Sequence, residues 1–280
     1  MVIGVMISYC GKPMLRRSAG DLPVTLSVAG FDPSGGAGII ADVRTFTAFD
    51  CFATAAVTSV TSQNTTGVFN ATHLSVEMVR AQVLAIVEEK QVAAVKTGML
   101  PTREIVSEVA RLFRETNLPA PVVDPVIRST SGYALIEDGA LETLIKELLP
   151  LARVVTPNIP EAETITGLRI VDEAGMHRAA QAIRALGARA ALIKGGHLMS
   201  QESGVRSRES EAIDVLDDGG QVKVFRGEWI DGGVVRGTGC RLSAAIAAGL
   251  GKGKSLEASI EAAKRFVAAA IRAAHISEVV

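Results

Sequence analysis

The sequence has few cysteines, few histidines and no long apolar run, and each shortage excludes a class of protein. The three cysteines, Cys10, Cys51 and Cys240, are an odd and sparse set, which argues against a disulfide framework and favours a reducing compartment. The four histidines show no metal-ligand spacing, so a zinc site is not expected. No stretch approaches the roughly 18 uninterrupted apolar residues of a membrane-spanning helix.

The chain also has no excess of charge of either sign. It carries 29 Lys and Arg against 30 Asp and Glu, for a net charge of −1, which argues against a nucleic-acid binder that depends on a basic surface. Apolar residues make up 48% and charged residues 21% of the chain, a composition typical of a globular protein with a core. We therefore expect a cytoplasmic protein with small-molecule ligands and no membrane or nucleic-acid partner.

The N-terminal segment is not typical of a secretory signal. Its positive charges, Lys12, Arg16 and Arg17, follow the apolar residues 1–9, whereas a signal peptide has the opposite order. We expect residues 1–22 to form a loosely ordered extension, and residues 23–280 to form a single domain, since one α/β domain can reach this length.

From Val24 onward, short β-prone runs alternate with helical patterns. Several runs are apolar without alternation, as strands buried on both faces are. The predicted strands are Val24–Ala29, Ala55–Val60, Val92–Lys96, Val122–Asp124, Val154–Thr156 and Ala191–Lys194. Repeated strand–helix units predict an α/β fold with a mostly parallel sheet between two layers of helices.

The helical segments carry start signals, and the end of the chain departs from the repeat. Predicted helices follow Ser75, Thr102, Asp138 and Asp172, of which the last three suit a cap. Residues 199–211 are polar and charged and indicate a mobile loop. Two β-prone runs around residues 217–220 then predict a hairpin, and two helices, 238–248 and 255–274, close the chain.

Two glycine-rich segments are candidates for phosphate or ligand contact. Residues 30–38 hold four glycines directly after the first predicted strand, and glycine allows close approach of the backbone to a ligand. The alternative is a tight strand–helix turn without a ligand. Gly237-Thr238-Gly239-Cys240 opens a predicted helix, whose free N–H groups bind anions.

Cys240 falls in the first turn of that helix. There the helix dipole is expected to lower the pKa of the thiol and make it available as a base. The alternative is a small buried residue, which is the usual fate of a cysteine.

Polar residues after two later strands form a third candidate. Asn158 and Glu161 are three residues apart and suit the water shell of a hard cation such as Mg²⁺. The alternative is a proline-led helix start in which the charge of Glu161 interacts favourably with the helix dipole.

Lys194 ends a predicted strand and suits a phosphate as a point charge. The alternative is an ordinary surface lysine.

Together these segments resemble the ribokinase-like superfamily and, more narrowly, its hydroxymethylpyrimidine/phosphomethylpyrimidine kinases. Seven motifs recur in family order from about residue 24 to 274: AGFDPSGGAGIIAD (29–42), TSQNTTGV (61–68), VKTGML (95–100), VVDPV (122–126), TPNIPEA (156–162), IKGGH (193–197) and GTGCRLSAAIA (237–247).

The resemblance implies one ribokinase-like α/β/α domain that transfers the γ-phosphoryl group of ATP to 4-amino-5-hydroxymethyl-2-methylpyrimidine and then to its monophosphate, in thiamine biosynthesis. It implies a pyrimidine pocket built from five residues: Gly30, Asp42, Gln63, Met99 and Val126. Gln63 and Asp42 suit the polar edge of an aminopyrimidine, and Met99 and Val126 supply apolar walls.

The resemblance also assigns the phosphoryl-transfer machinery. Gly237, Thr238 and Gly239 would stabilise the moving phosphoryl group, and Thr238 would also contact ATP. Cys240 is the candidate base for the hydroxymethyl group. Asn158 and Glu161 would organise Mg²⁺, either directly or through water, and Lys194 would help to hold ATP. The resemblance to the family also implies a homodimer.

One departure and two alternatives stay open. Arg236 precedes the glycine turn where the family often has histidine, at a position suited to contact substrate or phosphate. The nearest alternative activity is a pyridoxine or pyridoxal kinase, because a hydrophobic pocket separates such close analogues by only about 1–3 kcal/mol. An alternative of another class is a pyrimidine-binding sensor without turnover, against which the intact Gly237–Cys240 turn argues.

Overall fold

The computed structural model describes residues 22–137, 139–196, 211–230 and 236–278, with side chains up to residue 274. Apart from Leu22, the predicted extension 1–22 lies outside the described residues, and so does the predicted loop 199–211 apart from Glu211. Asp138, the expected helix cap, also lies outside them.

A nine-stranded sheet runs through the described part of the chain in the order β3-β2-β1-β4-β5-β6-β7-β8-β9. The five pairings from β2 through β1 and β4 to β7 are parallel, whereas β3, β8 and β9 pair antiparallel. The strands are β1 Val24–Phe31, β2 Phe52–Gln63, β3 Val68–His73, β4 Val92–Thr97, β5 Val122–Val123, β6 Val154–Val155, β7 Ala190–Lys194, β8 Glu211–Asp218 and β9 Gln221–Glu228.

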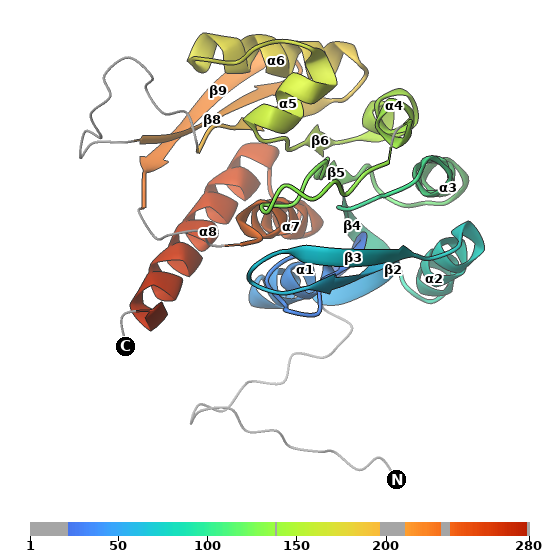
Figure 1. Ribbon diagram of the computed structural model, residues 1–280. Helices are drawn as coiled ribbons and strands as arrows, with labels where there is room; N and C mark the ends of the chain where they lie inside the picture. Colours follow the sequence, from blue (N-terminus) through green and yellow to red (C-terminus); the bar gives the residue numbers. More distant parts are fainter. Residues whose placement is uncertain (1–21, 138, 197–210, 231–235, 279–280) are drawn as a thin grey trace.

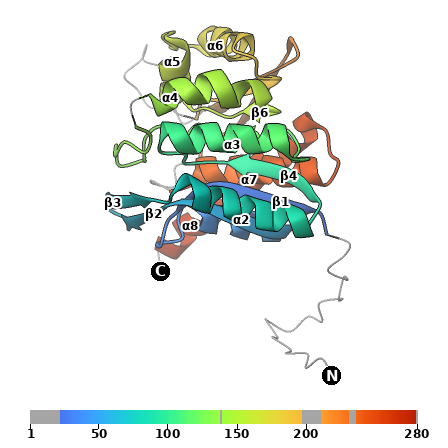
Figure 2. The same cartoon turned by 90° about the vertical axis from the view of Figure 1, so that its right-hand side faces the viewer.

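Helices cover both faces of this sheet (Figures 1 and 2). The helices α2–α6 pack on one face, and α1, α7 and α8 pack on the other. The α-helices are α1 Gly38–Ala48, α2 Val76–Glu89, α3 Arg103–Glu115, α4 Ala140–Thr143, α5 Ile159–Thr166, α6 Glu173–Ala185, α7 Thr238–Gly251 and α8 Leu256–Glu278. A π-helical segment, Leu144–Leu148, and a 3-10 segment, Leu149–Leu151, continue α4. The predicted α/β/α architecture is confirmed.

Alternation within the short central strands explains why their sequences are continuously apolar. Val122 and Val154 face the core under α7, whereas their neighbours Val123 and Val155 face the core under α3 and α6. Successive side chains of a strand point to opposite faces, so a strand covered on both faces needs apolar residues at every position.

Local signals place most of the helix starts correctly. The Thr102 hydroxyl accepts a hydrogen bond from the Ile105 amide at 3.3 Å, and the Asp172 carboxylate accepts one from the Gly175 amide at 2.6 Å. The helix expected after Asp138 begins with Gly139 as its cap, in the left-handed conformation.

One strand was not predicted from the sequence. β3 pairs antiparallel with the end of β2, and its residues are largely exposed, with Phe69 64% accessible. The strand lies at the edge of the sheet and has little apolar burial to leave a pattern in the sequence. β2, which ends at Gln63, and β3 together form a hairpin.

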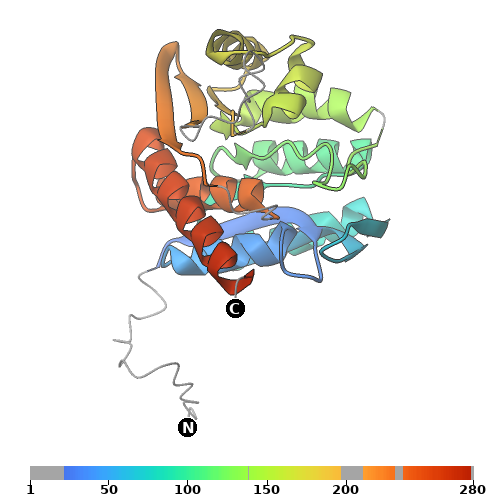
Figure 3. The same ribbon diagram turned by 60° about the vertical axis from the view of Figure 1, so that its left-hand side comes forward.

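The parallel strands end at one edge of the sheet, and the N-terminus of α7 points to it. In an open α/β sheet this carboxyl edge is where ligands bind. The hairpin of β8 and β9 (orange) and α8 (red) lie beside one another beyond α7 (Figure 3), joined by an ion pair between Lys223 and Glu257 at 2.7 Å. No helix among the described residues is long and apolar enough to cross a membrane.

Candidate active site

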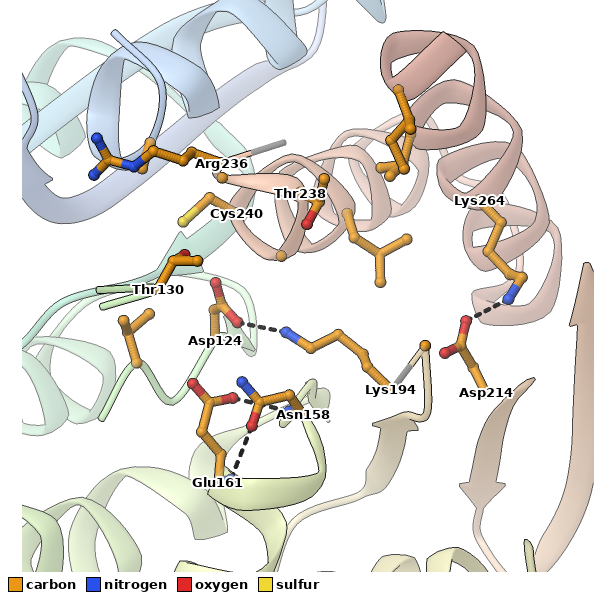
Figure 4. A pocket seen from close by; sticks show the side chains of 18 of the residues that line it. Asp124, Thr130, Asn158, Glu161, Lys194, Asp214, Arg236, Thr238, Cys240 and Lys264 are labelled. Atoms are coloured by element: carbon orange, nitrogen blue, oxygen red, sulfur yellow. Dashed lines mark hydrogen bonds and ion pairs between the residues drawn. The ribbon is translucent and has the colours of Figure 1, made fainter. Parts of the chain in front are cut away.

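A cavity of about 1530 Å³ opens along the carboxyl edge of the sheet (Figure 4). Cavities that hold one small ligand are usually about 300–1,000 Å³, so this one has room for two ligands side by side. Its walls include nearly all of the residues predicted for the site: Gly30, Gln63, Met99, Val126, Asn158, Glu161, Lys194, Gly237, Thr238, Gly239 and Cys240.

The two glycine-rich segments, more than 190 positions apart in the sequence, meet at this cavity. Gly237 has a φ of +71°, and a Cβ atom added to it would overlap the carbonyl oxygen of Gly36. Gly38 has a φ of +57°, and a Cβ atom there would overlap the carbonyl oxygen of Gly30. Both contacts need glycine, because any side chain would push the two backbones apart.

Asp32 fixes the shape of the first glycine-rich loop. Its carboxylate is buried and accepts hydrogen bonds from the Ser34 amide at 2.9 Å, the Ser34 hydroxyl at 2.7 Å and the Ala37 amide at 2.9 Å. A charge-assisted turn of this kind holds the loop in one conformation. The loop therefore presents an ordered backbone to the first turn of α7.

Cys240 lies half-buried in the first turn of α7. The expectation of a lowered thiol pKa was wrong: burial raises the pKa of Cys240 to about 11, although the Lys96 ammonium and the Gly38 amide act to lower it. The cost of placing an anion in a poorly solvated site exceeds the stabilisation from the positive groups nearby.

Lys96 and Asp42 form a fully buried ion pair beside Cys240. The Lys96 Nζ lies 2.8 Å from Asp42 Oδ2, and neither side chain is accessible to solvent. Burial opposes the charge on Lys96, but the neighbouring Asp42 and Cys240 raise the pKa of its ammonium above the ordinary value. Burial raises the pKa of Asp42, against the effect of Lys96.

Asp42 lies behind the wall of the cavity, in contrast to the other residues predicted for the pyrimidine pocket. It is not among the residues that line the cavity, and it accepts hydrogen bonds from Ser27 Oγ at 2.6 Å and from Lys96. Its place in the structure is that of a residue that holds Lys96, which itself lines the cavity.

Lys194 reaches the underside of the first turn of α7 from the end of β7. Its Nζ is 3.1 Å from Asp124 Oδ1 and 3.1 Å from the position of a Cβ atom added to Gly239. Despite burial, Asp124 raises the pKa of Lys194, and Lys194 together with Lys96 lowers the pKa of Asp124. A charged lysine is thus fixed next to free helix N–H groups.

Asn158 and Glu161 form a capping box at the start of α5. The Glu161 carboxylate accepts a hydrogen bond from the Asn158 amide at 2.8 Å, and Asn158 Oδ1 accepts one from the Glu161 amide at 2.9 Å. Burial raises the pKa of Glu161 to about 7, with a further increase from Asp124 and an opposing effect from Lys194. The helix-start alternative for this segment therefore describes its local structure.

Lys96, Asp124 and Asp32 were missed as site residues, although their segments had been noted as motifs. Lys96 and Asp124 are charged residues at the ends of otherwise apolar predicted strands, and strand ends form the ligand-binding edge of such sheets. A charge in that position was a usable signal. Asp32 had a weaker signal, as an acidic residue inside a glycine-rich loop.

The sequence of the chain matches that of a known family. The family described as phosphomethylpyrimidine kinase matches residues 32–278. The chain belongs to this family. The chain is 45% identical over 251 residues to a hydroxymethylpyrimidine/phosphomethylpyrimidine kinase of Streptomyces coelicolor, a match that covers 90% of this chain and 89% of that relative. As a member of this kinase family, the protein is a phosphotransferase.

Solved structures support the same grouping and identify the fold as ribokinase-like. The crystal structure of phosphomethylpyrimidine kinase from Clostridium difficile matches with a TM-score of 0.76 and 38% identity, over 89% of this chain and 99% of that one. A pyridoxal kinase from Staphylococcus aureus in complex with ADP matches with a TM-score of 0.80 and 33% identity, over 90% of this chain and 88% of that one.

Proposed function

We propose that the protein uses ATP to phosphorylate 4-amino-5-hydroxymethyl-2-methylpyrimidine and then its monophosphate to the diphosphate, as a step of thiamine biosynthesis. The observation that carries this proposal is the meeting of the Gly237–Cys240 turn with the Gly30–Gly38 loop over one cavity. Family membership supplies the substrate class.

The pyrimidine is proposed to lie at the end of the cavity formed by Gly30, Gln63, Met99 and Val126. A Cβ atom added to Gly30 would lie 2.9 Å from the Met99 sulfur, so the absence of a side chain at Gly30 makes room for Met99 in the cavity wall. Gln63 receives a hydrogen bond on Oε1 from Thr61 at 3.2 Å. Among the described residues its side-chain nitrogen donates no hydrogen bond, which suits a ring nitrogen or another acceptor on the pyrimidine.

The phosphoryl group is proposed to cross in front of the first turn of α7. The backbone N–H groups of Gly237, Thr238 and Gly239 suit the charge that spreads over its oxygens in the transition state. Lys194, held under Gly239 by Asp124, adds a positive charge on the side of the nucleotide phosphates. Donors that are already in place in this way would stabilise the transferred anion with little reorganisation of the protein.

Cys240 is proposed to act as the base for the alcohol. In the first transfer the hydroxymethyl proton passes to the Cys240 thiolate, which becomes a thiol. The alcohol oxygen bonds to the γ-phosphorus of ATP, the bond from that phosphorus to the β-phosphate oxygen breaks, and ADP leaves. With a pKa of about 11, the free enzyme holds little thiolate at neutral pH, so Lys96 and the Gly38 amide matter because both favour the anionic form.

Asn158 and Glu161 are proposed to hold Mg²⁺ indirectly. Mg²⁺ in nucleotide sites keeps several waters and takes one or two carboxylates together with substrate phosphates, and the buried Glu161 near Asp124 fits that donor set. Both capping groups are already engaged in hydrogen bonds to backbone amides, which favours contact through water. When bound, the ion would neutralise charge on the phosphates of ATP.

We further propose a cytoplasmic homodimer. The chain mass is 29.3 kDa, and light scattering coupled to gel filtration should give about twice this value. A mass equal to one chain at micromolar concentration would contradict the dimer.

A pyridoxal kinase is the second candidate function. The specific observation in its favour is the TM-score of 0.80 to the Staphylococcus aureus pyridoxal kinase, above the 0.76 to the Clostridium difficile phosphomethylpyrimidine kinase. The higher sequence identity to pyrimidine kinases, 38% against 33%, favours the pyrimidine.

A coupled ADP-release assay tests the proposal. The protein should be supplied separately with the hydroxymethylpyrimidine, its monophosphate and pyridoxal, at saturating ATP with Mg²⁺. We expect kcat/KM to be highest for the two pyrimidines. A higher kcat/KM for pyridoxal would favour the second candidate, and tight pyrimidine binding without ADP release would indicate a sensor.

A further inference from the structure

Arg236 lies between the two ends of the cavity. It directly precedes Gly237, and its guanidinium donates a hydrogen bond to the carbonyl oxygen of Asn64, the residue after Gln63. In Figure 4 it lies at the opposite end of the site from Lys264 and Asp214, with the first turn of α7 between them. Arg236 therefore borders both the proposed pyrimidine end and the turn that receives the phosphoryl group.

Most cations that line the cavity are neutralised by a carboxylate. Lys96 pairs with Asp42, Lys194 with Asp124 and Lys264 with Asp214, and further pairs hold Lys223, Arg226 and Arg272. Within the described residues, three lining cations have no carboxylate within ion-pair distance: Arg128, Arg236 and Arg265. Of these three, Arg236 directly precedes the Gly237 turn, and the hydrogen bond from its side chain goes to a neutral carbonyl. Its charge is therefore available to an anionic ligand.

The contact with Asn64 uses only part of the donor capacity of the Arg236 guanidinium. A guanidinium has five N–H donors arranged for bidentate contact with phosphate, and the contact with Asn64 uses Nη1. That contact fixes the side chain at the end of β2, so the remaining donors need little reorganisation to bind a ligand.

We propose that Arg236 binds the phosphate that the substrate already carries in the second transfer, and so raises the preference of the enzyme for the monophosphate over the alcohol. This inference rests on the proposed function. In the second transfer an oxygen of the substrate phosphate bonds to the γ-phosphorus of ATP, and the bond from that phosphorus to ADP breaks. The dianionic phosphate needs no base, but it needs a positive charge that the alcohol does not.

The test compares Arg236→Gln and Arg236→Lys with the unaltered protein. We expect Arg236→Gln to raise the KM for the monophosphate at least tenfold and to change the KM for the alcohol and for ATP by less than twofold. Arg236→Lys keeps the positive charge but lacks the paired N–H donors of a guanidinium, so its KM for the monophosphate should lie between those of Arg236→Gln and the unaltered protein. Added salt should weaken monophosphate binding in the unaltered protein more than in Arg236→Gln.

Arg178→Gln is the matched control, because Arg178 is exposed on α6 and does not line the cavity. It should leave both KM values unchanged. Equal increases in KM for alcohol and monophosphate would mean that Arg236 acts through the Asn64 turn alone, and would overturn the inference; so would no increase in either.

Calorimetric titration of the monophosphate without ATP separates this inference from the proposed function. If the unaltered protein turns over neither pyrimidine, the proposed function fails. Weaker monophosphate binding by Arg236→Gln than by Arg178→Gln would still support the phosphate contact, and equal binding by the two variants would overturn it.

Discussion

At the scale of single residues, Cys240 shows how position and environment act in opposite directions. The Lys96 ammonium and the Gly38 amide favour a thiolate, but burial outweighs them and the pKa rises to about 11. The Cys240 thiolate is thus a strong base, but little of it is present in the free enzyme at neutral pH. Whether the residue matters depends on which step needs proton removal.

We predict that Cys240→Ala slows the first transfer about 10²–10⁴-fold, the usual contribution of a general base, and slows the second far less. The alcohol must lose a proton, whereas the monophosphate is already anionic. Single-turnover rates with each substrate supplied separately measure this difference.

Cys51→Ala is the control for thiol loss, since Cys51 is buried in the core under α7 and α8. It should change neither rate. Equal losses in both steps for Cys240→Ala would show that Cys240 shapes the anion-binding turn and does not act as a base.

The buried Lys96–Asp42 pair leads to a prediction about stability. Lys96→Met leaves the Asp42 carboxylate buried without its cation, which should lower the free energy of unfolding by about 3–5 kcal/mol. Adding Asp42→Asn removes the stranded charge and should recover most of that loss. Urea denaturation of the two single variants and the double variant measures the coupling; strictly additive losses would contradict it.

At the scale of secondary-structure elements, the start of α7 needs Gly237 for two reasons: its positive φ and its close contact with the backbone of Gly36. Gly237 and Gly253 both have positive φ, +71° and +75°, but a Cβ atom at Gly237 would overlap Gly36, whereas one at Gly253 would have nothing within 4 Å. The two positions therefore separate backbone strain from loss of the contact between the loops.

We predict that Gly237→Ala lowers kcat/KM for both substrates more than 100-fold, because it separates the two loops that form the anion-binding turn. Gly253→Ala should cost about 1–2 kcal/mol of stability from left-handed strain alone and leave the kinetics unchanged. Steady-state kinetics and thermal unfolding of both variants provide the comparison. Comparable activity in the two variants would show that the contact with Gly36 is not needed.

At the scale of the whole molecule, Glu161 links stability to pH. The pKa of the Glu161 carboxyl is 4.5 in an unfolded chain and about 7 in the folded protein. Between these two pH values the folded protein therefore holds a proton that the unfolded chain has lost. The contribution of Glu161 to stability is therefore greatest below pH 4.5 and is lost as pH rises to about 7, by at most about 1.4 kcal/mol per pH unit.

We predict that Glu161→Gln flattens this part of the stability profile, because glutamine can keep the capping hydrogen bond and does not titrate. The measurement is the urea midpoint between pH 5 and 8 for the unaltered protein and the variant. Glu163→Gln, on the same helix, is the control and should keep the slope. A slope that is unchanged in Glu161→Gln would place the pKa of Glu161 near its ordinary value.

The sequence by itself determined the α/β class, the central strands and the positions of the two glycine-rich turns. These features depend on local causes: strands buried on both faces must be apolar throughout, and helix starts need caps and glycines that act within a few residues. β3 escaped prediction because an exposed edge strand such as Val68–His73 has no such local requirement.

Only the tertiary structure decided which charges pair and how they titrate. The contact of Gly36 with Gly237 joins segments far apart in the sequence, and the pairing of Asp42 with Lys96 places Asp42 behind the cavity wall. The raised pKa of Cys240 follows from burial. Solvation and Coulomb interactions depend on distances through space, and the order of residues along the chain does not specify those distances until the sheet brings the strand ends together.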